Sequence, residues 1–252
     1  MLAWVAPEQV AGLAWWPPIA VVVVLIGINI VNNRLAPQEH YLLWSFGGSV
    51  VLVAFGLLDG NSWTDMGLSW RYWIPGLIWA AICIGAVTLV YLVGSSFKPT
   101  REAFHDERIA TMSGGKLAFQ ALVEVPFGTV LFEEIAFRAV LLSMLVRRFD
   151  LIWGVAIAAI LFGLWHILPS IGTHEQNPAM GKVAGSGWRG NVVAVLVSVL
   201  ATAFSGVVFA ALRLVSGSVL APMGLHWATN GLGYGFSWLL IRGRRRRGEG
   251  GE

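Results

Sequence analysis

The chain has 252 residues, of which 56% are hydrophobic and 12% are charged, and its mean hydropathy is +0.70. Soluble domains carry about 25% charged residues, so this composition excludes an ordinary soluble enzyme and indicates a protein embedded in a lipid bilayer. The net charge of +3 does not indicate nucleic-acid binding, because five of the seventeen basic residues lie in the C-terminal run RGRRRR, which is typical of a membrane-flanking segment. The single cysteine, Cys83, excludes an internal disulfide.

About seven hydrophobic segments, in chain order, are long enough or nearly long enough to cross a bilayer. Backbone N–H and C=O groups in lipid have to pair within their own segment, so each segment is expected to be a helix. The predicted fold is therefore all-α, a polytopic transmembrane helix bundle of about seven spans in a single membrane domain, 1–252. The segments cover about residues 10–31, 40–58, 74–97, 117–146, 151–168, 191–212 and 218–241.

The N-terminal segment lacks the basic start of a signal peptide and is expected to be retained. The fourth segment is too long for one straight span, and Pro126 is expected to divide it into a surface-lying part and a membrane helix. The polar stretches 98–116 and 169–190 are loops too short to be domains. Solvated side chains are expected for the histidines in these loops and at span edges, which are His40, His105 and His174.

Basic residues predict the orientation. With seven spans and a cytoplasmic C-terminus, twelve basic residues lie inside and four outside, the distribution that the positive-inside rule favours. The tail, 242–252, is then cytoplasmic and is expected to bind anionic lipid, with about 1 kcal/mol per arginine near the surface. The inside set is Arg34, Lys98, Arg101, Arg108, Lys116, Lys182, Arg189 and the five tail arginines, and the outside set is Arg71, Arg147, Arg148 and Arg213.

Three polar clusters interrupt the apolar segments. They are Glu133, Glu134 and Arg138 in LFEEIAFRAVL, His166 in FGLWH, and His226 with Asn230 in LHWATN. A charge near the bilayer centre costs about 2.5–3.5 kcal/mol on insertion scales, so these residues need partners. Helical residues four apart share a face, so Glu134 can pair with Arg138. By the same spacing, His226 and Asn230 are expected to point into one space, while Glu133, about 100° around the helix from Glu134, stays free to face something else.

Each cluster alone also has a structural interpretation. A lone intramembrane histidine is often a hydrogen-bond partner between helices, and an EExxxR run can be a polar seam. Glu124 is interpreted as interfacial, near Lys116, with no catalytic role.

Taken together, two carboxylates, two histidines and an amide on three spans are suited to hydrolysis. A glutamate can take a proton from water while a histidine holds that water or protonates the leaving group, and a histidine with an amide can stabilise an oxyanion. Alternatively, Glu and His side chains bind zinc and activate its water. The sequence has neither HExxH nor GxSxG, so the site is expected to be assembled between helices.

The three clusters resemble the CAAX protease and bacteriocin-processing (CPBP) family of intramembrane endopeptidases, which includes prenyl-protein proteases and bacterial relatives often called Abi proteins. The family pattern is EExxxR, then FxxxH, then HxxxN or HxxxD, each on its own helix. Here the pattern is EEIAFR at 133–138, FGLWH at 162–166 and HWATN at 226–230, with no departure at a motif position. The resemblance covers about 117–241, the expected catalytic core.

The resemblance implies a catalytic set of Glu133, Glu134, His166, His226 and Asn230. In it, Glu133 is the base that activates water together with His166, and His226 with Asn230 faces the oxyanion. Glu134 and the ion pair with Arg138 hold the site in shape. The family is named as metalloproteases, although a glutamate mechanism without a metal is also argued for it. Zinc is therefore possible, with Glu133, His166 and His226 as candidate ligands, and asparagine would be an unusual fourth neighbour.

The implied function is hydrolysis of a peptide bond in a membrane-associated peptide or protein, of CAAX type or bacteriocin-processing type, in a bacterial plasma membrane. Two alternatives from other classes are an ion- or proton-coupled transporter that uses the buried acids as a relay and a non-catalytic immunity or assembly protein. The sequence has no sign of the inverted repeats of many transporters. Partners are expected to be lipid and a membrane-associated substrate, with no nucleic acid.

Overall fold

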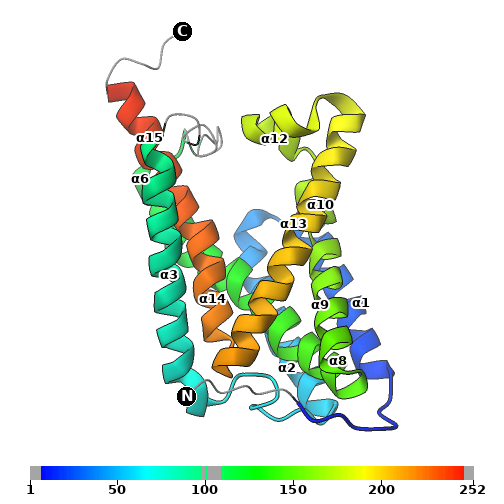
Figure 1. The fold of residues 1–252 in the computed structure, drawn as a ribbon. Coiled ribbons are helices and arrows are strands. Elements are labelled where there is room, and N and C mark those ends of the chain that lie inside the picture. The colour runs from blue at the N-terminus through cyan, green and yellow to red at the C-terminus, as the bar shows by residue number, and fades with distance from the viewer. Residues whose placement is uncertain (1–6, 98–99, 101–108, 110, 247–252) are drawn as a thin grey trace.

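The computed structural model describes residues 7–97, 100, 109 and 111–246, and all regular structure among these residues is helical (Figure 1). The first half of the chain forms three long helices: α1 (Trp16–Ile30), α2 (Tyr41–Leu58) and α3 (Trp73–Ser96). Shorter turns flank them: η1 (Val31–Leu35), η2 (Gln38–His40) and η3 (Trp70–Tyr72). The expected all-α membrane bundle is confirmed.

The second half begins with one uninterrupted helical stretch, residues 114–148, called the central helix below. It consists of α6 (Gly114–Phe119), η5 (Gln120–Val130), α7 (Leu131–Glu133), η6 (Glu134–Leu141) and α8 (Leu142–Arg148). Next come α9 (Leu151–Trp165), α10 (Ile167–Ser170), α11 (Thr173–Gln176), α12 (Pro178–Ala184) and α13 (Gly187–Ser216). The chain then continues through α14 (Leu220–Trp227), η7 (Ala228–Leu232) and α15 (Gly233–Arg246). The stretches η1, η5, η6 and η7 are π-helical.

The expected count of about seven spans is not confirmed. Among the described residues, four helices are long and apolar enough to cross a membrane: Trp16–Leu35, Tyr41–Leu58, Trp70–Ser96 and Gly187–Ser216. A fifth results if Leu151–Trp165 and Ile167–Glu175, which meet at a 41° bend, form one span. The central helix and the stretch 220–246 are as long but carry the polar clusters, which lower their hydropathy.

The central helix is not broken at Pro126, so the expected division into a surface-lying part and a membrane helix is wrong. Pro126 lies within the π-helical stretch η5, where backbone N–H groups bond to the carbonyl five residues earlier. Proline has no N–H to offer to the carbonyl of Ala121. The indole of Trp227 donates to that carbonyl instead, at 2.9 Å, and thereby joins α14 to the central helix.

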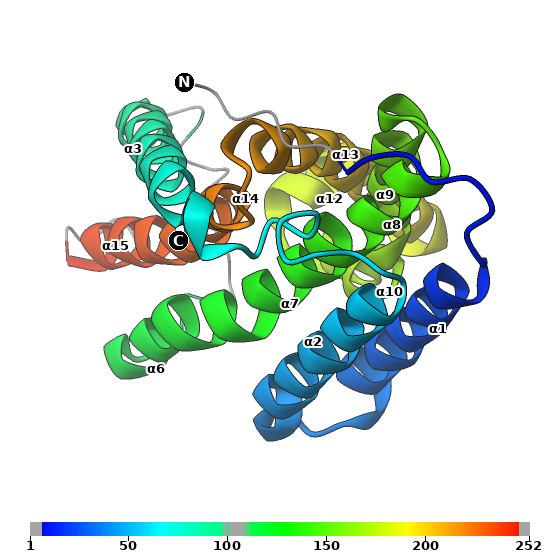
Figure 2. The same cartoon turned by 90° about the horizontal axis from the view of Figure 1, so that it is seen from below.

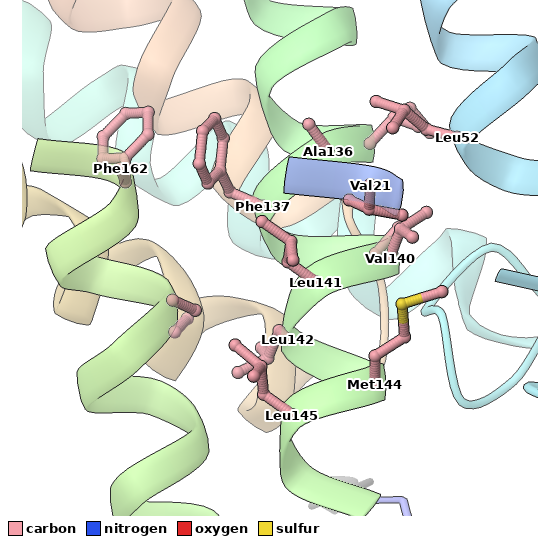
Figure 3. Close-up of a cluster of buried hydrophobic side chains, with 14 of the residues drawn as sticks. Val21, Leu52, Ala136, Phe137, Val140, Leu141, Leu142, Met144, Leu145 and Phe162 are labelled. Carbon is pink, nitrogen blue, oxygen red and sulfur yellow. The ribbon is translucent and has the colours of Figure 1, made fainter. Parts of the chain in front are cut away.

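The core lies around the lower half of the central helix. Figure 3 shows apolar side chains of this helix between Phe162 on α9 and Val21 and Leu52 on α1 and α2. Its members on the central helix include Ala136, Val140 and Leu141, each fully buried. Because lipid is as apolar as leucine, packing rather than water exclusion stabilises such contacts.

The other helices surround the central helix in pairs. α14 and α15 lie along α3, and α9 lies along α13 (Figures 1 and 2). Small residues permit the second pairing, since a Cβ on Gly163 would lie 2.7 Å from the carbonyl oxygen of Val199, and one on Gly206 would lie 3.0 Å from Ala159 Cα. This arrangement places α9, α13 and α14 against the side of the central helix that carries Glu133, Glu134 and Arg138.

Candidate functional site

The side chains of Glu133, Glu134, His166 and His226 meet inside the bundle, although they come from three separate stretches of the chain. Glu133 ends α7, His166 lies at the break between α9 and α10, and His226 lies in the last turn of α14. Oε2 of Glu133 lies 4.0 Å from Nε2 of His166 and 3.8 Å from Nε2 of His226. The sequence therefore identified residues that the fold brings together from distant positions.

The two oxygens of Glu133 have different surroundings. Oε1 accepts a hydrogen bond of 2.9 Å from the indole N–H of Trp165. Oε2 is buried and has no hydrogen-bond partner among the described residues. A buried acceptor without a partner is costly, and separations of about 4 Å between polar atoms are those that one water can bridge. A water that bridges Oε2 and an imidazole nitrogen would supply the missing hydrogen bond.

Glu134 is fully buried and joins two cationic or potentially cationic groups. Its Oε1 lies 3.3 Å from Nη1 of Arg138, one turn further along the central helix, and 2.8 Å from Nδ1 of His226 on α14. Because a carboxylate accepts, Nδ1 of His226 carries the proton in this contact. The ring is thereby oriented with Nε2 towards Glu133.

Two phenylalanines enclose the Arg138 guanidinium. Its central carbon lies 3.8 Å from the ring centroid of Phe162 and 4.7 Å from that of Phe209. Desolvated cation–π contacts of this kind contribute about 2 kcal/mol, which offsets part of the cost of burying the cation. Phe209 also stacks on the ring of His226, with centroids 5.1 Å apart. Residues of α9 and α13 therefore complete the packing around the charged groups.

His166 is the half-buried member of the set, with a side chain that is 20% exposed. Its Nδ1 lies 2.8 Å from the carbonyl oxygen of Phe162. A carbonyl only accepts, so Nδ1 donates, and Nε2 of the neutral ring is an acceptor directed towards Glu133. His166 is thus the most exposed of the four side chains in this cluster.

Asn230 does not join the group. Its side chain is exposed and makes no hydrogen bond within the part of the chain that the structure describes, whereas His226 is buried. The expectation that both point into one space rested on α-helical spacing. In the structure the two side chains share no hydrogen bond, and Asn230 is the exposed one of the pair.

Sequence reasoning missed two side chains that touch the site, Trp165 and Phe209. Trp165 lies within FGLWH, but the chain has thirteen tryptophans, so the presence of one more did not indicate a functional role. Phe209 stands in an apolar run with no motif. The expected solvation of His174 is wrong, since it is 7% exposed and packed against Gly190. His40 is exposed as expected, and His105 lies outside the described residues.

The candidate zinc ligands do not form a metal site in the observed arrangement. Among the described residues, no group of three His, Cys, Asp or Glu side chains is placed to hold a metal ion. Ligands about 2.0 Å from tetrahedral zinc lie roughly 3.3 Å apart, whereas Glu133 Oε2 lies 3.8 and 4.0 Å from the two imidazole nitrogens.

Two cavities adjoin the site. A polar one of about 350 Å³ is lined by Asn32, Tyr41, Gln120, Glu124 and Thr129, among others. The hydroxyls of Tyr41 and Thr129 share a hydrogen bond of 2.9 Å. Thr129 lies one helical turn before Glu133 on the central helix. An apolar one of about 170 Å³ lies between α1 and α9 and is lined by Trp165, Phe137 and Asn29, among others.

A comparison with protein families agrees with this site. Residues 115–232, a little under half of the chain and including all three polar clusters, match the family model described as Type II CAAX prenyl endopeptidase Rce1-like. The resemblance is confirmed over this region, which is similar to the Rce1-like CAAX endopeptidases and consistent with the CPBP family. No curated protein and no solved structure matches the chain. The chain is thus a helical integral membrane protein with a region similar to an intramembrane protease family.

The geometry predicts different stabilities for variants of the adjacent glutamates. Glu134→Ala leaves Arg138 buried without its carboxylate and should lower the free energy of unfolding by about 3–5 kcal/mol. Glu133→Gln keeps the shape and an acceptor for the Trp165 indole, and should change it by less than about 1 kcal/mol. Thermal unfolding in detergent measures both, and equal losses in the two variants would contradict this division between the two residues.

Proposed function

We propose that this protein is an endopeptidase that hydrolyses a peptide bond in a membrane-associated peptide or protein, of CAAX type or bacteriocin-processing type. The observation that carries the proposal is the buried Oε2 of Glu133, which lacks a hydrogen-bond partner among the described residues and faces two imidazole nitrogens. The family match favours this activity over the transporter and the immunity or assembly protein.

In the proposed reaction, a water molecule occupies the gap between Glu133 Oε2 and Nε2 of His166. It donates one hydrogen bond to each. Glu133 removes a proton as the water oxygen attacks the carbonyl carbon of the scissile peptide bond. The resulting tetrahedral intermediate collapses when the carbon–nitrogen bond breaks, and the proton held on Glu133 passes to the leaving amine. The products are a carboxylate-ended and an amine-ended fragment.

The oxyanion of the intermediate needs hydrogen-bond donors. His226 is proposed as one donor through Nε2, the nitrogen that the contact between its Nδ1 and Glu134 turns towards Glu133. Asn230 is proposed as the second donor. Its amide is exposed and makes no hydrogen bond to another described residue, so it is available to a bound substrate.

The proposed orientation places the C-terminus in the cytoplasm, with anionic lipid at the basic tail. α6, α12 and the end of α15 lie at one end of the bundle (Figure 1) and carry Lys116, Lys182 and Arg242. At the other end, Arg148 forms a buried ion pair with Asp59, and Arg147 donates to the carbonyl of Asp59 at 2.8 Å. The basic residues at that end have partners within the protein, which supports the positive-inside assignment. Lys98, Arg101, Arg108 and the last tail residues lie outside the described residues.

Glu133→Gln tests the proposed base. The amide cannot accept a proton, so cleavage should fall at least about 10³-fold, the upper range for removing a general base with its positioned water. Proteomics of membrane fractions from cells with the wild-type protein or Glu133→Gln identifies the fragments, and the purified proteins are then compared in proteoliposomes. The exposed Glu39→Gln serves as the control and should retain activity. Undiminished cleavage by Glu133→Gln would remove the proposed mechanism.

Asn230→Ala tests the oxyanion assignment. If Asn230 donates in the transition state, its loss should lower kcat by about 10²–10³ with little change in KM, because the bond forms as negative charge develops. Steady-state kinetics in proteoliposomes measures both constants. Full activity of Asn230→Ala would remove it from the mechanism.

The same assay tests the zinc alternative. If Glu133, His166 and His226 bind zinc, a strong chelator should silence the wild-type protein and added zinc should restore it. The water mechanism instead predicts that chelated protein stays active while Asn230→Ala remains defective.

A further inference from the structure

Trp165, which is not one of the motif residues, makes the one hydrogen bond that the structure gives to Glu133. It ends α9, directly before His166, and its side chain is 9% exposed. Phe132 and Phe137 pack against the indole, with ring centroids 5.6 and 5.9 Å from it. The indole N–H, its single donor, points at Oε1 of Glu133 at 2.9 Å. Both packing and hydrogen bonding therefore hold this ring against the carboxylate.

The backbone of Trp165 is held by a residue from another part of the chain. α9 ends at Trp165, so its carbonyl is one of those that a helix end leaves without an intrahelical partner. Asn29 on α1 donates to this carbonyl at 2.8 Å. Asn29 is 8% exposed, and its own side-chain oxygen accepts from Asn33 at 2.7 Å. α1 lies outside residues 115–232, so this support comes from beyond the matched region.

We propose that Trp165, anchored by Asn29, is a positioning residue that fixes the Glu133 carboxylate for reaction, an inference that rests on the proposed function. The terminal torsion of a glutamate is broad, so without a donor the plane of the carboxylate can turn and carry both oxygens away from the imidazoles. The indole engages Oε1 and thereby directs the unpartnered Oε2 towards Nε2 of His166 and His226. Reactions of this kind lose about 10²-fold when a reacting group is displaced by 1 Å.

The alternative is that Trp165 only packs, and kinetics separates the two. The substrate is a farnesylated, internally quenched CAAX peptide in proteoliposomes. Trp165→Phe keeps an aromatic ring but removes the N–H, and should lower kcat by about 10–100-fold, the range for a hydrogen bond to a charged group. KM should change by less than about twofold, because the bond orients a base and does not hold the substrate.

Trp227→Phe is the matched control. Trp227 directly follows a motif histidine, and its indole also donates one hydrogen bond of 2.9 Å. The acceptor of that bond is the backbone carbonyl of Ala121 and not a site residue, so the substitution removes an equivalent bond away from Glu133. It should lower the unfolding temperature about as much as Trp165→Phe does, while kcat stays within about threefold of wild type. Replacing Trp165 by 3-benzothienylalanine, which has the indole shape with sulfur in place of N–H, should reproduce the kcat defect of Trp165→Phe.

Asn29→Ala tests the anchor. If Asn29 acts through Trp165, its effect on kcat should largely vanish in the Trp165→Phe background, since coupled residues are not additive. Additive effects would remove Asn29 from the proposal.

The outcomes distinguish this inference from the function on which it rests. Normal kcat in Trp165→Phe, with Glu133→Gln inactive, overturns the positioning role alone. Equal losses of kcat in Trp165→Phe and Trp227→Phe also overturn it, in favour of packing. Full activity of Glu133→Gln overturns the proposed function and the inference with it, and no cleavage of the peptide by wild type overturns the CAAX form of that function.

Discussion

The bundle can hold its charges because the Glu134 carboxylate lies between Arg138 and His226, at 3.3 and 2.8 Å. Removing one partner from a buried ion pair costs about 3–5 kcal/mol, so each of these groups depends on the other two. Arg138 belongs to the central helix and His226 to α14, and the phenylalanines around the guanidinium come from α9 and α13. The charged centre thus fixes how four elements pack, in a protein with few other polar contacts available in lipid.

Satisfying Glu134 in this way leaves its neighbour Glu133 for chemistry. Consecutive residues on a helix point about 100° apart, so one carboxylate faces the structural cation while the other faces the two imidazoles. The contact between Glu134 and His226 also determines which nitrogen of that ring is presented to Glu133. One histidine therefore links the buried ion pair to the carboxylate that is proposed to react.

The sequence predicted the all-α bundle and the residues of the charged centre, because ionisable groups in apolar segments are rare and their four-residue spacing has a direct meaning on a helix. It did not predict Trp165, Phe209 or Asn29, because aromatic residues and isolated amides in an apolar helix have no distinctive spacing. The error at Pro126 has a local cause, since it lies in a π-helical stretch, where the α-helical rule of proline tolerance does not apply. The helical stretches that are less apolar than the candidate spans are those that carry Glu133 and His226, since the same polar residues lower their hydropathy.

The central claim is that Glu133 activates water and does not itself attack the peptide bond. A single turnover in water labelled with oxygen-18, followed by mass spectrometry of the product and of the peptide that contains Glu133, tests it most directly. Attack by water predicts one labelled oxygen in the new carboxylate of the product and none in Glu133. A covalent anhydride opened at the glutamyl carbon would instead transfer an unlabelled oxygen to the product and leave the label in Glu133, and that result would contradict the account.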